Sequence, residues 1–89
     1  MTEERTTLLE FPCAFPVKVM GEAREGFADA MLEIVLRHAP DFDAASMEMK
    51  SSSAGKYVSL TCTITAISQT QLDDLYREIS GHPMVSMAL

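Results

Sequence analysis

Histidine and cysteine are the side chains of this chain that could perform acid–base or nucleophilic chemistry near neutral pH. The sequence holds His38, His82, Cys13 and Cys62. Their spacing does not pair a nucleophile with a base and with a third group that would orient that base. His38 falls at the end of a predicted helix, where a packing or capping role is expected. We therefore predict no catalytic residue and rank an enzyme last, with His38 or Cys13 as the place to look for one.

Metal, phosphoryl and RNA chemistry each need residues that this chain does not supply. A copper or zinc carrier of this size needs a Cys-x-x-Cys pair in its first loop, and the loop at residues 20–23 contains no thiol. An acyl-phosphate hydrolase needs an asparagine to orient its water, and the chain has no asparagine. An RNA-binding sheet needs aromatic side chains on its open strands, where this sequence has serine and threonine. We expect no metal, no cofactor and no nucleic acid.

Two segments could hold an anion. Gly21 is predicted to lie between the first strand and the first helix, where main-chain N–H groups and a helix N-terminus converge. Gly21 and Glu22 are therefore our candidate ligand-binding residues, and Gly21→Val should abolish binding without unfolding the domain. The run Ser51–Lys56 looks like a phosphate loop, but its glycine–lysine pair precedes a strand rather than a helix. We interpret that run as a hairpin connection.

The segment Tyr57–Thr65 indicates the architecture that must position these residues. Its apolar positions alternate strictly with hydroxyl-bearing ones, and they are Val58, Leu60, Cys62 and Ile64. A period of two with many β-branched residues is typical of a strand that has one buried and one polar face. Such a strand between helices implies an antiparallel sheet with helices on one face only.

The remaining elements follow from changes of period along the chain. The expected strands are 15–20, 47–50, 57–65 and 84–89, and the expected helices are 22–38 and 68–80. The second helix begins with a Ser68–Gln71 capping box and ends at Gly81, and in the last strand Val85 and Met87 share one face. The order is βαββαβ, so we predict an α+β, ferredoxin-like fold with a four-stranded antiparallel sheet of order 4-1-3-2.

Length and charge limit the classes of partner. The chain has 89 residues and a net charge of −6, which disfavours contact with phosphate backbones or anionic lipid. No apolar run reaches the ~18–20 residues of a membrane span, and acidic residues stand where a signal peptide carries basic ones. We expect a cytoplasmic protein with no Cys13–Cys62 disulfide. Residues 1–7 are expected to form a flexible arm, and residues 8–89 a single domain.

Several short motifs resemble a known family. In order they are Leu9-Glu10-Phe11-Pro12, Phe15-Pro16, Lys18-Val19-Met20-Gly21, Arg37-His38-Ala39-Pro40 and the run from Ser52 to Ser59. This set resembles the YbeD family of small bacterial proteins of uncharacterised function, over residues 8–89. The resemblance implies a ferredoxin-like fold similar to ACT domains, which are amino-acid-sensing regulatory modules. ACT domains commonly bind their effector at a subunit interface near the loop after the first strand, which matches residues 20–22.

We predict a non-enzymatic regulatory or protein-interaction module, expected to be a homodimer. The candidate interaction surface is the polar sheet face or an edge strand, because an uncovered edge can accept another strand. Its residues are Lys18, Lys50, Ser59, Thr61 and Thr63, with Glu48 and Thr65 on the same face. The alternative is a small-ligand sensor of ACT type that binds an amino acid or a related carboxylate at Gly21 and Glu22 in a subunit interface.

Overall fold

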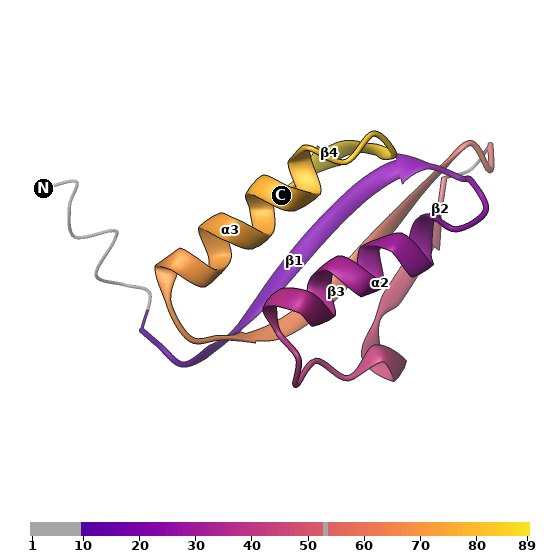
Figure 1. Ribbon diagram of the computed structural model, residues 1–89. Helices are drawn as coiled ribbons and strands as arrows, with labels where there is room; N and C mark the ends of the chain where they lie inside the picture. The colour runs from indigo at the N-terminus through magenta and orange to yellow at the C-terminus, as the bar shows by residue number, and fades with distance from the viewer. Residues whose placement is uncertain (1–9, 53) are drawn as a thin grey trace, which may run out of the picture.

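The computed structural model describes residues 10–52 and 54–89, so the arm predicted for residues 1–7 lies outside the described residues. Figure 1 shows two helices packed across one face of a sheet. In chain order the elements are β1 (Cys13–Glu22), α2 (Phe27–His38), the 3₁₀ turn η1 (Ala44–Ser46), β2 (Glu48–Ser51), β3 (Tyr57–Ala66), α3 (Gln69–Ser80) and β4 (Val85–Ala88). The predicted βαββαβ order is confirmed.

The sheet has the predicted topology. Its four strands lie in the order β2-β3-β1-β4, and every neighbouring pair is antiparallel. The central pair is in register along its whole length, from Cys13 opposite Ala66 to Glu22 opposite Tyr57. Because both helices cover the same face (Figure 1), the other face of the sheet is left open by the described residues. The ferredoxin-like α+β fold is therefore confirmed.

The core lies between the sheet and the helices. The strands contribute every second residue, as their alternation predicted, and the helices contribute residues three and four apart. The largest fully buried side chains are Val17, Val19, Leu60, Cys62, Ile64, Phe27, Met31, Val35, Leu75 and Ile79. Among the described residues, no helix is both long enough and apolar enough to cross a membrane.

Several predicted boundaries were wrong; β1 begins at Cys13 rather than at residue 15, and three other differences have a local reason. β1 continues to Glu22 because that residue still pairs with Tyr57 on β3. The first helix begins at Phe27 rather than Glu22, because Gly26 has a φ of 87°, which a right-handed helix cannot contain. β2 begins at Glu48 rather than Met47, whose N–H donates to the carbonyl of Ala44 and closes the 3₁₀ turn.

The start and end of α3 are as predicted. The Ser68 hydroxyl accepts a hydrogen bond from the Gln71 N–H at 3.0 Å, and the Gln71 side chain accepts one from the Ile67 N–H at 2.7 Å. Two main-chain N–H groups that the helix leaves free are thereby satisfied. Gly81 follows the last helical residue and donates to the carbonyl of Arg77.

The last strand differs from its prediction. Met20 pairs with Met87, whereas the next residue of β1, Gly21, pairs with Val85, so Ser86 is an extra residue in a β-bulge. Val85 therefore lies on the helix-covered face and Met87 on the open face. The prediction that these two side chains share one face was wrong, because a bulge shifts the alternation by one residue.

Candidate functional site

The open face of the sheet gathers the residues that the sequence predicted for interaction. Lys18 on β1 lies opposite Thr61 on β3, and Lys50 on β2 lies opposite Ser59 on β3. Thr63 lies opposite Pro16. The main chain of Pro16 faces the β4 side of the sheet at a point that β4 does not reach, so the N–H that proline lacks is not needed for strand pairing. All five predicted residues thus share one surface, which two edge strands border.

This face also carries an apolar group that the sequence reasoning did not select. Its members are strongly exposed: Met20 at 39%, Met87 at 51% and Leu89 at 68%. Met20 and Met87 are cross-strand partners, and Leu89 exchanges two main-chain hydrogen bonds with Lys18, of 3.2 and 2.8 Å. Together with Lys18 and Ser59 they line a shallow hollow of about 130 Å³. The expectation of a polar face therefore needs correction, because the face is apolar on its β1–β4 side.

Part of this apolar group had a signal in the sequence. Met20 alternates with the buried Val19, so the period of two already placed it on the open face. Met87 had no such signal, because its place on the open face depends on its pairing with Met20, while the bulge turns Val85 to the other face. Leu89 follows Ala88, the last residue of β4, and its place depends on its main-chain bonds to Lys18.

The candidate ligand residues Gly21 and Glu22 do not lie at a helix N-terminus. Gly21 is buried within β1, and a Cβ atom there would come within 2.7 Å of the Phe27 ring and closer still to the Met84 carbonyl. Gly21→Val would therefore disturb the packing, so it cannot serve as the binding test that the sequence suggested. The Glu22 side chain is exposed and lies 3.8 Å from the Arg24 guanidinium. Binding of a ligand at these two residues stays a prediction.

The structure does bring together the two segments that the sequence singled out for anions. The Ala23 N–H, just after β1, donates a 2.8 Å hydrogen bond to the Lys56 carbonyl at the start of β3. Between them lies a hollow of about 370 Å³ with predominantly polar walls. The residues that line it are Glu22, Ala23, Arg24, Gly55, Lys56 and Tyr57. Two basic side chains therefore face one hollow that has an acidic side chain at its rim.

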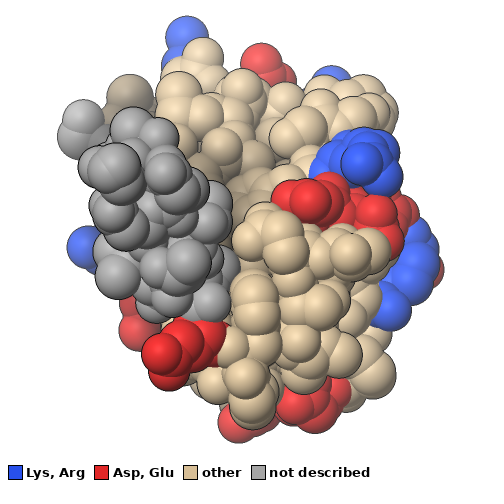
Figure 2. Space-filling model, turned by 90° about the vertical axis from the view of Figure 1, so that its left-hand side faces the viewer, with Lys and Arg blue, Asp and Glu red and all other residues tan. Residues whose placement is uncertain are grey.

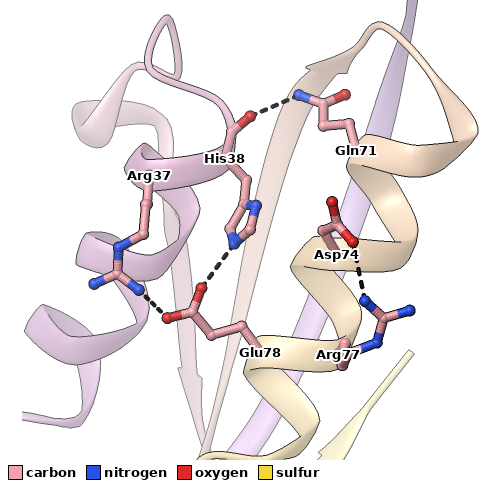
Figure 3. Close-up of polar contacts among 6 residues, drawn as sticks. All are labelled: Arg37, His38, Gln71, Asp74, Arg77 and Glu78. Atoms are coloured by element: carbon pink, nitrogen blue, oxygen red, sulfur yellow. Dashed lines mark hydrogen bonds and ion pairs between the residues drawn. The ribbon is translucent and has the colours of Figure 1, made fainter.

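His38 takes part in a bridge between the two helices (Figure 3). Its Nε2 atom lies 2.7 Å from a carboxylate oxygen of Glu78, and the other oxygen of that carboxylate accepts a hydrogen bond from Arg37. The Gln71 side chain donates to the His38 carbonyl at 2.9 Å. Glu78 is half-buried in this bridge. The geometry supports the packing role expected of His38.

The other reactive side chains have structural surroundings. The His82 Nδ1 atom accepts a hydrogen bond from the Met84 N–H at 3.1 Å within its own turn. Both cysteines are free, and burial raises the pKa of the Cys62 thiol to about 11. A thiol with that pKa stays protonated at neutral pH and is a poor nucleophile. Within residues 10–52 and 54–89, no three His, Cys, Asp or Glu side chains lie together as a metal site.

Charge on the surface is mixed. Figure 2 shows basic side chains at one side of the molecule that lie directly against acidic ones. The ion pairs among the described residues include Arg37–Glu78 and Arg77–Asp74, the second at 3.0 Å. Acidic neighbours reduce the positive potential that a nucleic acid would need on this face.

Fold and surface define a small α+β protein of the ferredoxin-like class, with an open sheet face. The model of the family described as "Protein of unknown function (DUF493)" matches residues 6–89, and the chain belongs to that family. A UPF0250 protein of Nitrosomonas europaea is 54% identical over the full length of both chains, and one of Chromobacterium violaceum is 45% identical, also over both full lengths. The resemblance to the YbeD family is confirmed, and the names of these relatives indicate no enzymatic function.

A solved structure shares the fold. The solution structure of protein HP0495 from H. pylori superposes with a TM-score of 0.69 at 13% identity, and the match covers 91% of this chain and 85% of that one. At this identity the likeness concerns the fold alone.

Proposed function

We propose that this protein is a non-enzymatic interaction module that binds a partner protein with the open face of its sheet. The observation that carries the proposal is the contiguous exposure of Met20, Met87 and Leu89 beside hydroxyl-bearing side chains. Aromatic residues, methionine and other apolar side chains inside a polar rim are characteristic of protein interfaces. His38 bridges the two helices and Cys13 packs against the core, so the two side chains that the sequence singled out for catalysis take part in packing.

The open face is of a suitable size for such a partner. Two central strands of ten residues and two edge strands of four, with strands about 4.8 Å apart and a rise of about 3.3 Å per residue, cover an area of roughly 450 Å². Stable protein–protein interfaces bury about 800 Å² on each partner. The open face supplies about half of that area, so a partner that also covers a bordering edge forms an interface of ordinary dimensions. We place this interaction in the cytoplasm, where free cysteines such as Cys13 and Cys62 persist.

A matched pair of variants tests the proposal. Met87→Glu puts a charge in the centre of the apolar group, whereas Ile67→Glu puts the same charge on a side chain that is 64% exposed in the β3–α3 connection. Proteins captured from bacterial extract by wild type and by both variants are quantified by mass spectrometry. We expect a partner that wild type and Ile67→Glu retain equally and that Met87→Glu loses at least about tenfold. Equal recovery on all three proteins would contradict the proposal.

The second candidate function is binding of a small carboxylate, which the hollow beside Arg24 and Lys56 favours. Two basic side chains in one hollow can bind a carboxylate through charge-assisted hydrogen bonds. A thermal-shift screen against amino acids and carboxylate metabolites, with the double variant Arg24→Ala/Lys56→Ala, tests this function. Stabilisation of wild type that the double variant lacks, and that Lys18→Ala retains, would support it. Stabilisation that survives in the double variant would exclude this hollow as the binding site.

A further inference from the structure

β2 forms one edge of the sheet, and its outer side pairs with no strand among the described residues. All four of its residues, Glu48–Ser51, are exposed. The Ser52 N–H donates to the Tyr57 carbonyl at 2.8 Å, which shows that the main chain of Ser52 faces β3. Main-chain groups alternate between the two sides of a strand. The N–H and C=O groups of Met49 and Ser51 therefore point outward, free to bind another strand.

We propose that a second copy of this chain pairs with this edge, β2 against β2, about a two-fold axis at Met49. Each Met49 would then exchange N–H···O=C hydrogen bonds with its symmetry mate, because both present outward-facing main-chain groups. On the open face, Glu48 would lie opposite Lys50 of the partner subunit, and Lys50 opposite Glu48 of the partner subunit. Directly opposed residues of opposite charge stabilise an antiparallel pair. The occupant of the edge is thus a second copy, and the pattern acid, methionine, base is complementary to itself.

Neighbouring registers lack this complementarity. An axis at Lys50 would place the two lysines opposite each other, and an axis at Glu48 would do the same with the two glutamates, which is destabilising. An axis between two adjacent residues would set an outward-facing main chain against an inward-facing one, which breaks the antiparallel ladder. An axis at Ser51 would leave both charges without an opposite partner across the edge.

Met49 adds an apolar contribution on the other face of the sheet. Its side chain points toward the helix-covered face, opposite Leu60, yet it remains 55% exposed. It borders a groove of about 320 Å³ between β2 and the start of α2, whose walls include Phe27, Ala28 and Val58. In the proposed pair the two methionines lie side by side across the axis, which removes apolar surface from water in both copies. The edge therefore offers main-chain, charged and apolar contacts in one register.

This inference extends the proposed interaction module but depends on the β2 edge, whereas the apolar group around Met87 lies at the opposite, β1–β4 side of the sheet. The resulting dimer would have a continuous eight-stranded sheet with its two open faces side by side. A partner protein could then engage both copies, which raises its overall affinity through the second contact. Self-association at β2 and partner binding at Met87 can accordingly be tested apart.

A charge reversal and its rescue test the register. Sedimentation velocity over a range of concentrations gives the dimer dissociation constant for wild type, Lys50→Glu, the swapped double variant Glu48→Lys/Lys50→Glu, and Lys18→Glu as a control on β1. We expect Lys50→Glu to weaken dimerisation at least about tenfold, the double variant to restore it, and Lys18→Glu to leave it unchanged. A wild type that stays monomeric at all concentrations, or a dimer that Lys50→Glu does not weaken, would overturn the proposal.

A cross-link provides a second, independent measurement. In a Cys13→Ser background, Met49→Cys places two thiols across the axis, where Cα atoms about 5.5 Å apart suit a disulfide. Mild oxidation should yield a covalent dimer with Met49→Cys and not with Ile67→Cys. Equal cross-linking of both variants, or none with Met49→Cys, would overturn the register. If the protein is a monomer and Met87→Glu still abolishes capture of the partner protein, this inference fails and the proposed function stands. If the Met49→Cys variant forms a covalent dimer but no partner protein binds the open face, the proposed function fails and this inference stands.

Discussion

Gly21 shows how a single residue can look like part of a site and serve packing instead. Its position after a strand suggested an anion-binding turn, but the structure places it inside β1, against Phe27 and the Met84 carbonyl. Its φ angle is not in the left-handed region, so the requirement for glycine is one of space. The sequence could not reveal this, because the neighbours that exclude a side chain come from α2 and from the turn before β4.

At Gly21 we predict that the addition of one methyl group strongly destabilises the fold. Gly21→Ala should lower the free energy of unfolding by about 2 kcal/mol or more, because neither a main-chain carbonyl nor a buried ring can easily move aside. Urea denaturation measures the change. Gly81→Ala is the matched control, since its nearest neighbour would be 3.4 Å away, and it should change stability by less than about 0.5 kcal/mol. Similar costs for the two variants would contradict the packing role of Gly21.

The raised pKa of Cys62 predicts how stability depends on pH in alkaline solution. Burial raises the pKa of this thiol from 9.0 to about 11, so above pH 9 the unfolded chain loses a proton that the folded chain retains. The unfolded state then binds fewer protons, and the free energy of unfolding falls as pH rises. Between pH 8 and pH 10, wild type should lose roughly 1 kcal/mol more than Cys62→Ala. Parallel pH profiles for the two proteins would show that Cys62 does not contribute.

Among the elements, local sequence patterns correctly predicted the strands and helices whose buried side chains recur with a regular period. The alternation in β3 identified its buried side chains, and the Ser68–Gln71 cap identified the start of α3. β4 was different, because its bulge arises from pairing with β1 and leaves no mark in a four-residue strand. The bulge places Val85 on the helix-covered face, whereas Met87 lies opposite Met20 on the open face. The part of the candidate site that the sequence missed is therefore the part that depends on contact between distant elements.

The bridge between α2 and α3 yields a prediction at this scale. Glu78→Ala removes the carboxylate that joins Arg37 and His38 and leaves the partly buried imidazole without its partner. We expect a loss of about 1 kcal/mol in the free energy of unfolding, measured by urea denaturation. Asp74→Ala breaks an exposed pair within α3 and should cost no more than about 0.5 kcal/mol. Equal costs would mean that the bridge between the helices adds nothing beyond a surface ion pair.

At the scale of the whole molecule, the two proposed interaction surfaces are the open face of the sheet and its β2 edge. The fold class, the strand order and the polar residues of the open face could be predicted from alternation and helical periodicity. The exposure of Met87 and Leu89 on that face and the outward main-chain groups at Met49 could not, because both depend on register between strands. The side chains on the open face and at Met49 are of common types, and it is their positions in the folded sheet that support the proposed interactions.

Site-specific photo-cross-linking in bacteria tests the central claim, that the open face binds a partner, most directly. A photoreactive amino acid replaces Met87 in one protein and Ile67 in another, and both are irradiated in growing cells. We expect position 87 to form a covalent adduct with one distinct protein and position 67 to form none. The same adducts from both positions, or no adduct from position 87 while the protein is folded and abundant, would contradict the claim.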